Sequence, residues 1–263
     1  MPQSSAAAHV PQRVLITAGA AGIGRAIADA FVWAGAVVHI CDIDEVAIES
    51  CRGASPALRA TRVDVADADA LTSWLDMAIG DLGGVDVLVN NAGTKGPTAF
   101  IEDISVDEWR SCLAVGLDAQ FICARRVVPV MKQQGSGSII NMSSMAGKYG
   151  FGMRTPYTAA KWAVIGLTKS IAIEVGPHRV RCNCICPGSV RGDRMDAVIA
   201  AEADHRGLSA AAVADEYVAG QSVKRFVEPD DIVGLCMFLA SPASSMISGQ
   251  AIGVDGHTET YHL

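Results

Sequence analysis

Short apolar runs alternate with longer stretches of helical periodicity along almost the whole of this 263-residue chain. Because strands that are joined through helices run parallel to one another, this alternation predicts an α/β fold: a doubly wound, seven-stranded parallel sheet with helices on both faces. The predicted strands lie at residues 13–18, 36–41, 59–63, 85–90, 137–142, 180–185 and 251–254, and the predicted helices at residues 22–33, 45–51, 68–82, 106–133, 156–175 and 230–239.

No linker and no internal repeat divides the chain, so we expect residues 1–263 to form a single domain. One segment breaks the alternation, because residues 200–221 are alanine-rich and helical and precede the last predicted strand. We expect this segment to belong to an insertion at about residues 189–225, which lies above the sheet and covers a substrate as a lid.

Charge and hydropathy argue against several classes of protein. The formal net charge is −7 and no basic stripe is present, which argues against a nucleic-acid-binding protein. No apolar run approaches the ~18 residues of a membrane span, and residues 1–13 do not have the pattern of a signal peptide. We therefore expect a cytoplasmic protein with neither nucleic-acid nor membrane partners.

Eight cysteines are spread along the chain, and without a signal peptide we expect them to be reduced, buried side chains. Cys182, Cys184 and Cys186 alternate along one predicted strand, so all three point to the same face. This spacing is a poor fit to a tetrahedral metal site, which favours two or more residues between paired ligands. Core packing is the favoured interpretation, and no metal is expected.

A glycine-rich loop follows the first predicted strand and leads directly into a helix. Its glycines, Gly19, Gly22 and Gly24, would let the backbone approach a pyrophosphate, while the helix N-terminus offers free N–H groups and a positive dipole. The spacing differs from the common Gly-x-Gly-x-x-Gly pattern, and a tight turn with close packing is the alternative.

Asp42 ends the second predicted strand, and its position favours NAD as the cofactor. A carboxylate there can accept both hydroxyls of the adenine ribose, and it would repel the additional phosphate of NADP. Neither Ala21 nor Ile43 supplies a positive charge nearby. The alternative is that Asp42 caps the following helix, a role for which Asp44 and Glu45 compete.

Tyr157 and Lys161 lie one turn apart on a predicted helix, for which Thr155 and Pro156 supply an N-cap and a first helical position. An ammonium group beside a phenol lowers the pKa of the phenol, as a general base for an alcohol, or a general acid for a ketone, requires near neutral pH. A Tyr-x-x-x-Lys pair alone is common on exposed helices, so its meaning depends on the segments around it.

Taken together, these segments resemble the short-chain dehydrogenase/reductase family of Rossmann-fold enzymes over residues 14–256. In that family an Asp-Val pair, here Asp64 and Val65, contacts adenine, and an Asn-Asn-Ala-Gly segment, here beginning at Asn90, supports the central strand and the cofactor. The resemblance implies a set of cofactor contacts by Gly19, Gly22, Ile23, Gly24, Asp42, Ile43, Asp64, Val65, Asn91, Ala92, Gly93, Tyr157, Lys161, Pro187, Gly188 and Val190.

The resemblance also implies the catalytic set Ser144, Tyr157 and Lys161. The serine would hold the substrate oxygen and stabilise the charge that builds there during hydride transfer, and the lysine would also bind a ribose hydroxyl of the nicotinamide half. The implied protein is an NAD-dependent dehydrogenase that interconverts a secondary alcohol and a ketone. It would assemble as a homotetramer or a homodimer.

Two positions depart from the family pattern. Ala18 stands where the family has glycine, and we expect Gly19 to take over the turn. Gly116 stands where the family has an asparagine that helps to hold a water relaying protons from the lysine, so we expect weakened turnover. The alternative function is an NAD-binding sensor or scaffold with little turnover. An epimerase or dehydratase is disfavoured, because the chain has little room for a separate substrate domain.

Four basic residues in loops at the same edge of the sheet, Lys95, Arg154, Arg191 and Arg194, could bind the substrate. Arginine suits bidentate recognition of a carboxylate, sulfonate or phosphate. They could equally be ordinary solvated side chains. The sequence therefore gives a hypothesis of a small polar, possibly anionic, substrate such as a sugar acid or a hydroxy acid.

Overall fold

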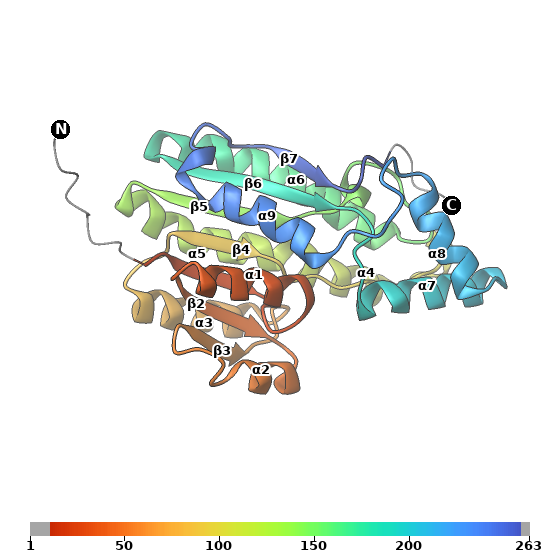
Figure 1. The fold of residues 1–263 in the computed structure, drawn as a ribbon, viewed down its shortest axis with the longest axis horizontal. Helices are drawn as coiled ribbons and strands as arrows, with labels where there is room; N and C mark the ends of the chain where they lie inside the picture. The colour runs from red at the N-terminus through yellow and green to blue at the C-terminus, as the bar shows by residue number, and fades with distance from the viewer. Residues whose placement is uncertain (1–10, 259–263) are drawn as a thin grey trace.

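The structure, a computed structural model, describes residues 11–258; residues 1–10 and 259–263, which include most of the segment inspected for a signal peptide, lie outside the described part. Seven parallel strands form one sheet in the order β3-β2-β1-β4-β5-β6-β7 (Figure 1). This confirms the predicted fold class. The strands are β1 (Arg13–Thr17), β2 (Val37–Asp42), β3 (Leu58–Arg62), β4 (Val87–Asn90), β5 (Gly137–Met142), β6 (Val180–Pro187) and β7 (Ala251–Val254).

Helices cover both faces of the sheet, so successive side chains along a strand enter different cores. On β1, Val14 and Ile16 pack with one group of helices, whereas Leu15 packs with the other. This explains why the strands are apolar on both sides. The first group is α1 (Gly22–Trp33), α2 (Glu45–Cys51) and α9 (Pro229–Ala240), and the second is α3 (Ala68–Leu82), α5 (Ala119–Gln134) and α6 (Thr155–Val175) (Figure 1).

The strand order reverses at β1, which pairs with β2 on one side and with β4 on the other. The two halves of the chain therefore wind away from each other at this point. In open α/β sheets such a reversal leaves a crevice beyond the carboxyl ends of the strands, where ligands bind. The loops after β1, β4, β5 and β6 meet at this edge.

The helix predicted over residues 106–133 is interrupted. The structure has α4 (Val106–Leu113), then a π turn at Ala114–Asp118, then α5. Gly116 is buried within this turn. The prediction of one continuous helix was wrong because periodicity does not reveal the extra residue of a π turn, a feature that occurs often at functional sites.

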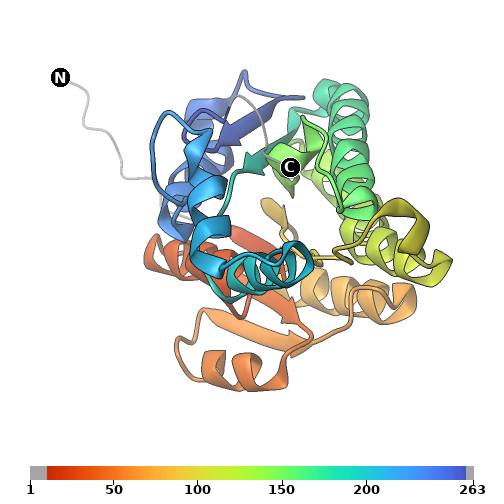
Figure 2. The same ribbon diagram turned by 90° about the vertical axis from the view of Figure 1, so that its right-hand side faces the viewer.

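Two helices, not one, occupy the region where residues 200–221 predicted a single helical segment. They are α7 (Asp193–Arg206) and α8 (Ala210–Ala219), and they lie beyond the carboxyl ends of the strands (Figures 1 and 2). Gly207 separates them, because its left-handed conformation with φ of 65° ends α7.

The cysteines contribute to the core. All eight are buried free thiols, and Cys182, Cys184 and Cys186 pack among apolar side chains between β6 and α6. Within residues 11–258, no group of three or more His, Cys, Asp and Glu side chains is placed to hold a metal ion. The same residues contain no helix with the length and apolar character to cross a bilayer.

The turn after β1 is formed differently from the expectation. Ala18 itself adopts a left-handed conformation, with φ of 50°, and Gly19 does not take over this role. Gly19 is required for a different reason: a Cβ atom there would lie 2.6 Å from Ile40 Cγ2 on β2. Alanine in the left-handed region is strained by about 1–2 kcal/mol.

We predict that Ala18→Gly stabilises the protein. Relief of the left-handed strain outweighs the entropy that glycine loses on folding, roughly 0.5–1 kcal/mol, so the melting temperature should rise by about 1–4 °C. The control is Ala20→Gly, because Ala20 has no positive φ, and this variant should melt at a lower temperature. A lower melting temperature for Ala18→Gly would contradict the assignment of strain to this residue.

Candidate active site

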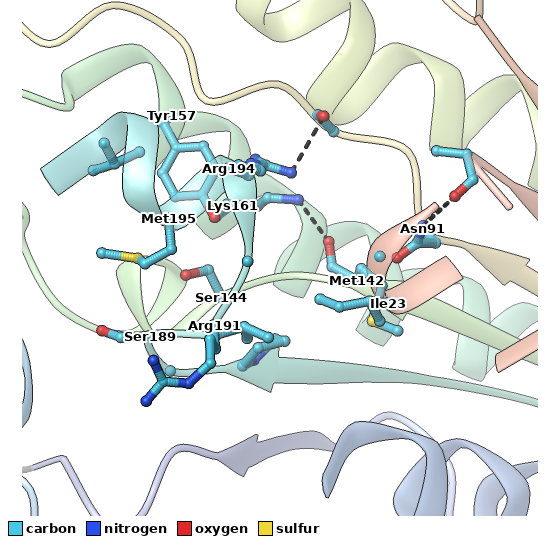
Figure 3. Close-up of a pocket in the computed structure, with 18 of the residues that line it drawn as sticks. Ile23, Asn91, Met142, Ser144, Tyr157, Lys161, Ser189, Arg191, Arg194 and Met195 are labelled. Carbon is cyan, nitrogen blue, oxygen red and sulfur yellow. Dashed lines mark hydrogen bonds between the residues drawn. The ribbon is translucent and has the colours of Figure 1, made fainter. Parts of the chain in front are cut away.

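A pocket of 420 Å³ lies at the carboxyl edge of the sheet, where the glycine loop, the start of α6 and the loop after β6 meet (Figure 3). It contains the catalytic set expected from the sequence. Its lining includes Ala18, Ala21, Gly22, Ile23, Asp42, Asn91, Gly93, Met142, Ser144, Phe151, Arg154, Tyr157, Lys161, Pro187, Gly188, Val190, Arg191, Arg194, Met195, Val198 and Tyr217.

The glycine loop forms a cradle at the N-terminus of α1. A Cβ atom on Gly24 would lie 2.0 Å from the Ala18 carbonyl oxygen, so only glycine allows this approach. No side chain caps α1, and its first N–H groups are left for another acceptor. A pyrophosphate fits this cradle. Gly22 and Ile23 line the pocket, whereas Gly19 and Gly24 act through packing.

Asp42 lines the pocket and is held in place by the backbone. Its carboxylate accepts hydrogen bonds from Ala20 N at 3.0 Å and from Ile43 N at 2.8 Å. Asp44, not Asp42, caps α2, because its side chain accepts from two N–H groups of the first turn. The capping alternative for Asp42 is therefore wrong. Its carboxylate keeps lone pairs for further donors.

The segment after β4 joins the central strands. Thr17 Oγ1 accepts from the N–H groups of Asn91 and Ala92, and the Asn91 side chain donates to the Ala18 carbonyl at 2.8 Å. The buried Asn90 side chain donates to Asn141 Oδ1 at 2.8 Å. Asn91 and Gly93 line the pocket, whereas Ala92 is buried and does not belong to the lining.

Besides Gly19, Gly24 and Ala92, three further expected cofactor contacts lie outside the pocket lining: Ile43, Asp64 and Val65. Asp64 and Val65 follow β3 at the same edge of the sheet, where the Asp64 carboxylate accepts from Ala66 N at 2.9 Å and Val65 is buried. Ile43 is 57% exposed. Their adenine and ribose contacts stay predictions.

Tyr157 and Lys161 both face the pocket from α6 (Figure 3). The Lys161 side chain is 3% exposed, and its Nζ donates to the Met142 carbonyl at the end of β5 at 2.7 Å. Ser144 faces the same space, and its hydroxyl accepts from Ala146 N at 3.1 Å. The helix begins one residue earlier than expected, with Arg154 at the N-cap position and Thr155 as its first residue.

The electrostatics of the pair are those of a proton-transfer site. Burial alone would raise the pKa of the Tyr157 phenol, but Lys161, Arg194 and a hydrogen bond from Ser144 outweigh it and hold this pKa below its ordinary value. Burial lowers the pKa of the Lys161 ammonium, and the nearby phenol offsets part of this effect. The phenolate of Tyr157 therefore forms at a lower pH than in an ordinary tyrosine.

Of the four basic residues expected at the substrate site, only two line the pocket without a carboxylate partner in the described part of the chain. Arg154 and Arg194 line the pocket and hydrogen-bond only to backbone carbonyls among the described residues. Arg191 lines the pocket too, but its guanidinium pairs with Glu228 at 2.9 Å. Lys95 is exposed and contributes its carbonyl, which accepts from Arg154.

Among the lining residues not expected from the sequence are five with large apolar or aromatic side chains: Phe151, Met142, Met195, Val198 and Tyr217. The last three come from α7 and α8. Only tertiary structure reveals them, because apolar residues on a helix have the same pattern whether they face a core or a ligand.

Comparison with known proteins places this site among oxidoreductases. A family model described as enoyl-(acyl carrier protein) reductase matches residues 18–257. The 2-keto-3-deoxy-L-fuconate dehydrogenase of Xanthomonas campestris pv. campestris is 37% identical over 250 residues, which cover 93% of this chain and 79% of that protein. The galactitol 2-dehydrogenase of Agrobacterium fabrum is 36% identical over 244 residues, which cover 92% of this chain and 95% of that protein.

Among solved structures, NAD+-bound xylitol dehydrogenase superposes with a TM-score of 0.89 at 26% sequence identity. The superposition covers 94% of this chain and 98% of that chain. The likeness therefore extends over almost the whole chain.

We predict that Lys161→Met raises the pKa of Tyr157. The substitution removes the largest influence that lowers this pKa and leaves the burial that raises it. Titration of the phenolate absorbance in the cofactor-free protein, taken as the difference from a matched Tyr157→Phe protein, measures the shift. The control is Lys169→Met, which removes an exposed lysine from the same helix and should leave the titration where it is. An unchanged titration in Lys161→Met would contradict the electrostatic coupling.

Proposed function

The chain belongs to the short-chain dehydrogenase/reductase family, and we propose that it is an NAD-dependent dehydrogenase that interconverts a secondary alcohol and a ketone on a small polar substrate with an anionic group. The family and the dehydrogenases that the chain is similar to indicate an oxidoreductase that acts on a small molecule.

NAD is the cofactor that the site favours. Asp42 is fixed by the backbone N–H groups of Ala20, Ile43 and Asp44, and a carboxylate held at this position accepts ribose hydroxyls and repels a phosphate. The glycine cradle at α1 fits the pyrophosphate. The solved xylitol dehydrogenase that shares this fold has NAD+ bound, which supports the same choice.

The proton is handled by side chains from α6 and from the end of β5. The nicotinamide supplies the hydride acceptor when it is bound. The phenolate of Tyr157, which the charge of Lys161 favours, takes the proton from the substrate hydroxyl and becomes the neutral phenol. The Ser144 hydroxyl donates to the substrate oxygen and stabilises the charge that develops on it.

The main support for an anionic group on the substrate is the Arg154 guanidinium, which has no carboxylate partner among the described residues. Its side chain is 4% exposed, lies 5.4 Å from the Phe151 ring and 5.1 Å from the Tyr157 ring, and donates to the Lys95 carbonyl. Its Nε atom has no hydrogen-bond partner, and no carboxylate among the described residues pairs with it. A buried cation without a counter-charge is destabilising. A carboxylate on the substrate would provide the counter-charge.

Residues beyond the strand ends would close this site. Met195 and Val198 from α7 and Tyr217 from α8 line the pocket, which supports the proposal that the insertion at residues 189–225 serves as a lid. Assembly as a homotetramer or a homodimer stays a prediction. Phe121 on α5 and Trp162 and Ile173 on α6 are exposed large apolar side chains that such an interface would cover.

The experiment compares hydroxy acids and sugar acids with uncharged polyols of similar size, with NAD and with NADP, in the wild type and in Arg154→Met. We expect NAD to be preferred and the acids to be the better substrates. In Arg154→Met the KM for an acid should rise at least about 30-fold, because the loss of one partner of a buried ion pair amounts to about 2 kcal/mol or more. The KM for a polyol should stay nearly constant.

The matched control is Arg191→Met, which removes a pocket arginine whose charge is already paired with Glu228. Arg191→Met should raise the KM for an acid much less than Arg154→Met does. If uncharged polyols outperform every acid in the wild type, and Arg154→Met affects both classes equally, the anionic substrate is refuted while the dehydrogenase chemistry remains.

A further inference from the structure

Gly116 leaves the site without the side chain that the family places at this turn. The residue is buried in the π turn between α4 and α5, directly against the helix that carries Tyr157 and Lys161. A Cβ atom on Gly116 would lie 3.2 Å from Ala160 Cβ, which is tighter than ordinary packing. The turn therefore approaches α6 closely, and an asparagine could enter only if α6 moved away by a few tenths of an ångström.

A buried amide one turn further along the chain occupies this region. The Gln120 side chain is 1% exposed, and its Nε2 donates to the Gly116 carbonyl at 3.2 Å and to the Met142 carbonyl at 3.2 Å. Both neighbours are acceptors, so the nitrogen of the amide must face them. A single side chain thus joins the π turn to the end of β5.

The Met142 carbonyl is the same atom that accepts from Lys161 Nζ, at 2.7 Å. Its position therefore decides where the lysine ammonium lies relative to the Tyr157 ring, whose centroid is 5.7 Å from Nζ. Gln120 Nε2 donates to this carbonyl as well, and Asn90 on β4 donates to the Gln120 backbone carbonyl at 3.5 Å. The side chain and the backbone of Gln120 together link the π turn, the end of β5 and β4 by hydrogen bonds.

We propose that Gln120 is a positioning residue for the reaction, which compensates for the missing asparagine by tying the Gly116 and Met142 carbonyls together and so fixing the acceptor of Lys161 Nζ. The inference rests on the proposed function for its meaning in catalysis. It accounts for how a chain with glycine at residue 116 keeps Tyr157 and Lys161 in the arrangement that proton transfer requires.

Gln120 also has an acceptor that no described residue uses. Its Oε1 is buried without a hydrogen-bond partner, and so is Asn90 Oδ1 on the neighbouring strand. A buried acceptor left unpaired lowers the stability of the fold. An apolar side chain at residue 120 would avoid this cost for Gln120. The amide at residue 120 is therefore better explained by the two hydrogen bonds of its Nε2 than by packing alone.

The test replaces Gln120 with methionine, which has nearly the same length and no donor. Its first readout is the Tyr157 phenolate titration in the cofactor-free protein, against a Gln120→Met/Tyr157→Phe reference. We expect the pKa of Tyr157 to rise, because Lys161 Nζ is no longer held at its acceptor.

The second readout is turnover with NAD. The kcat should fall about tenfold or more, and the rise of kcat with pH should move to higher pH. The KM for NAD should change by less than about threefold.

The matched control is Asn183→Leu, which removes another fully buried amide that bridges backbone groups, Ile247 O and Gln250 N, away from Lys161. It should lower the melting temperature and leave the Tyr157 titration unchanged. If Gln120→Met does not fold, Gln120→Leu is measured in the same way, with the same expected shift.

A folded Gln120 variant with the wild-type Tyr157 titration and the wild-type pH profile would overturn the proposal and leave Gln120 a packing residue. If the wild type shows no turnover with any substrate, the proposed function fails, yet the titration still decides the role of Gln120. The two failures are therefore distinguishable.

Discussion

The hydrogen bond from Lys161 Nζ to the Met142 carbonyl is the contact on which the site depends. It holds a buried ammonium group at the carboxyl edge of the sheet, next to a phenol whose pKa it lowers. A buried cation must be hydrogen-bonded to remain charged, and the carbonyl at the end of β5 provides this partner. The same carbonyl accepts from Lys161 on α6 and from Gln120 on α5, so it joins both helices to the end of β5.

The fold could be predicted because its signal is repeated in every strand and helix. Apolar runs of strand length and the glycines after β1 indicated a parallel sheet with a nucleotide site, and each predicted strand is present. Asp42 was placed at this edge because the carboxyl ends of parallel strands meet there, and Ser144 was placed by the family resemblance; both line the pocket. Tyr157 and Lys161 needed only the helical period to be placed together.

What the sequence did not reveal depends on contacts between distant segments. Arg154 and Arg191 look alike in the sequence, yet the first is buried without a carboxylate partner and the second pairs with Glu228. The glycine at residue 116 led to the expectation of weakened turnover, because the family's asparagine is missing there. Nothing in the sequence indicated that the Gln120 side chain contacts the Gly116 carbonyl. We expected Gly19 to adopt the conformation of the turn in place of Ala18. Instead, Ala18 itself is left-handed, and Gly19 is required because a side chain there would collide with Ile40.

The most direct test of the central claim, proton transfer through Tyr157 coupled to hydride transfer to NAD, is the rate at which reduced nicotinamide forms in the wild type and in Tyr157→Phe. The phenylalanine keeps the ring and removes only the hydroxyl. We predict that turnover of a hydroxy acid in the presence of NAD is lost in the variant, whereas binding of NAD, measured separately, is retained. Undiminished turnover in Tyr157→Phe would contradict the account.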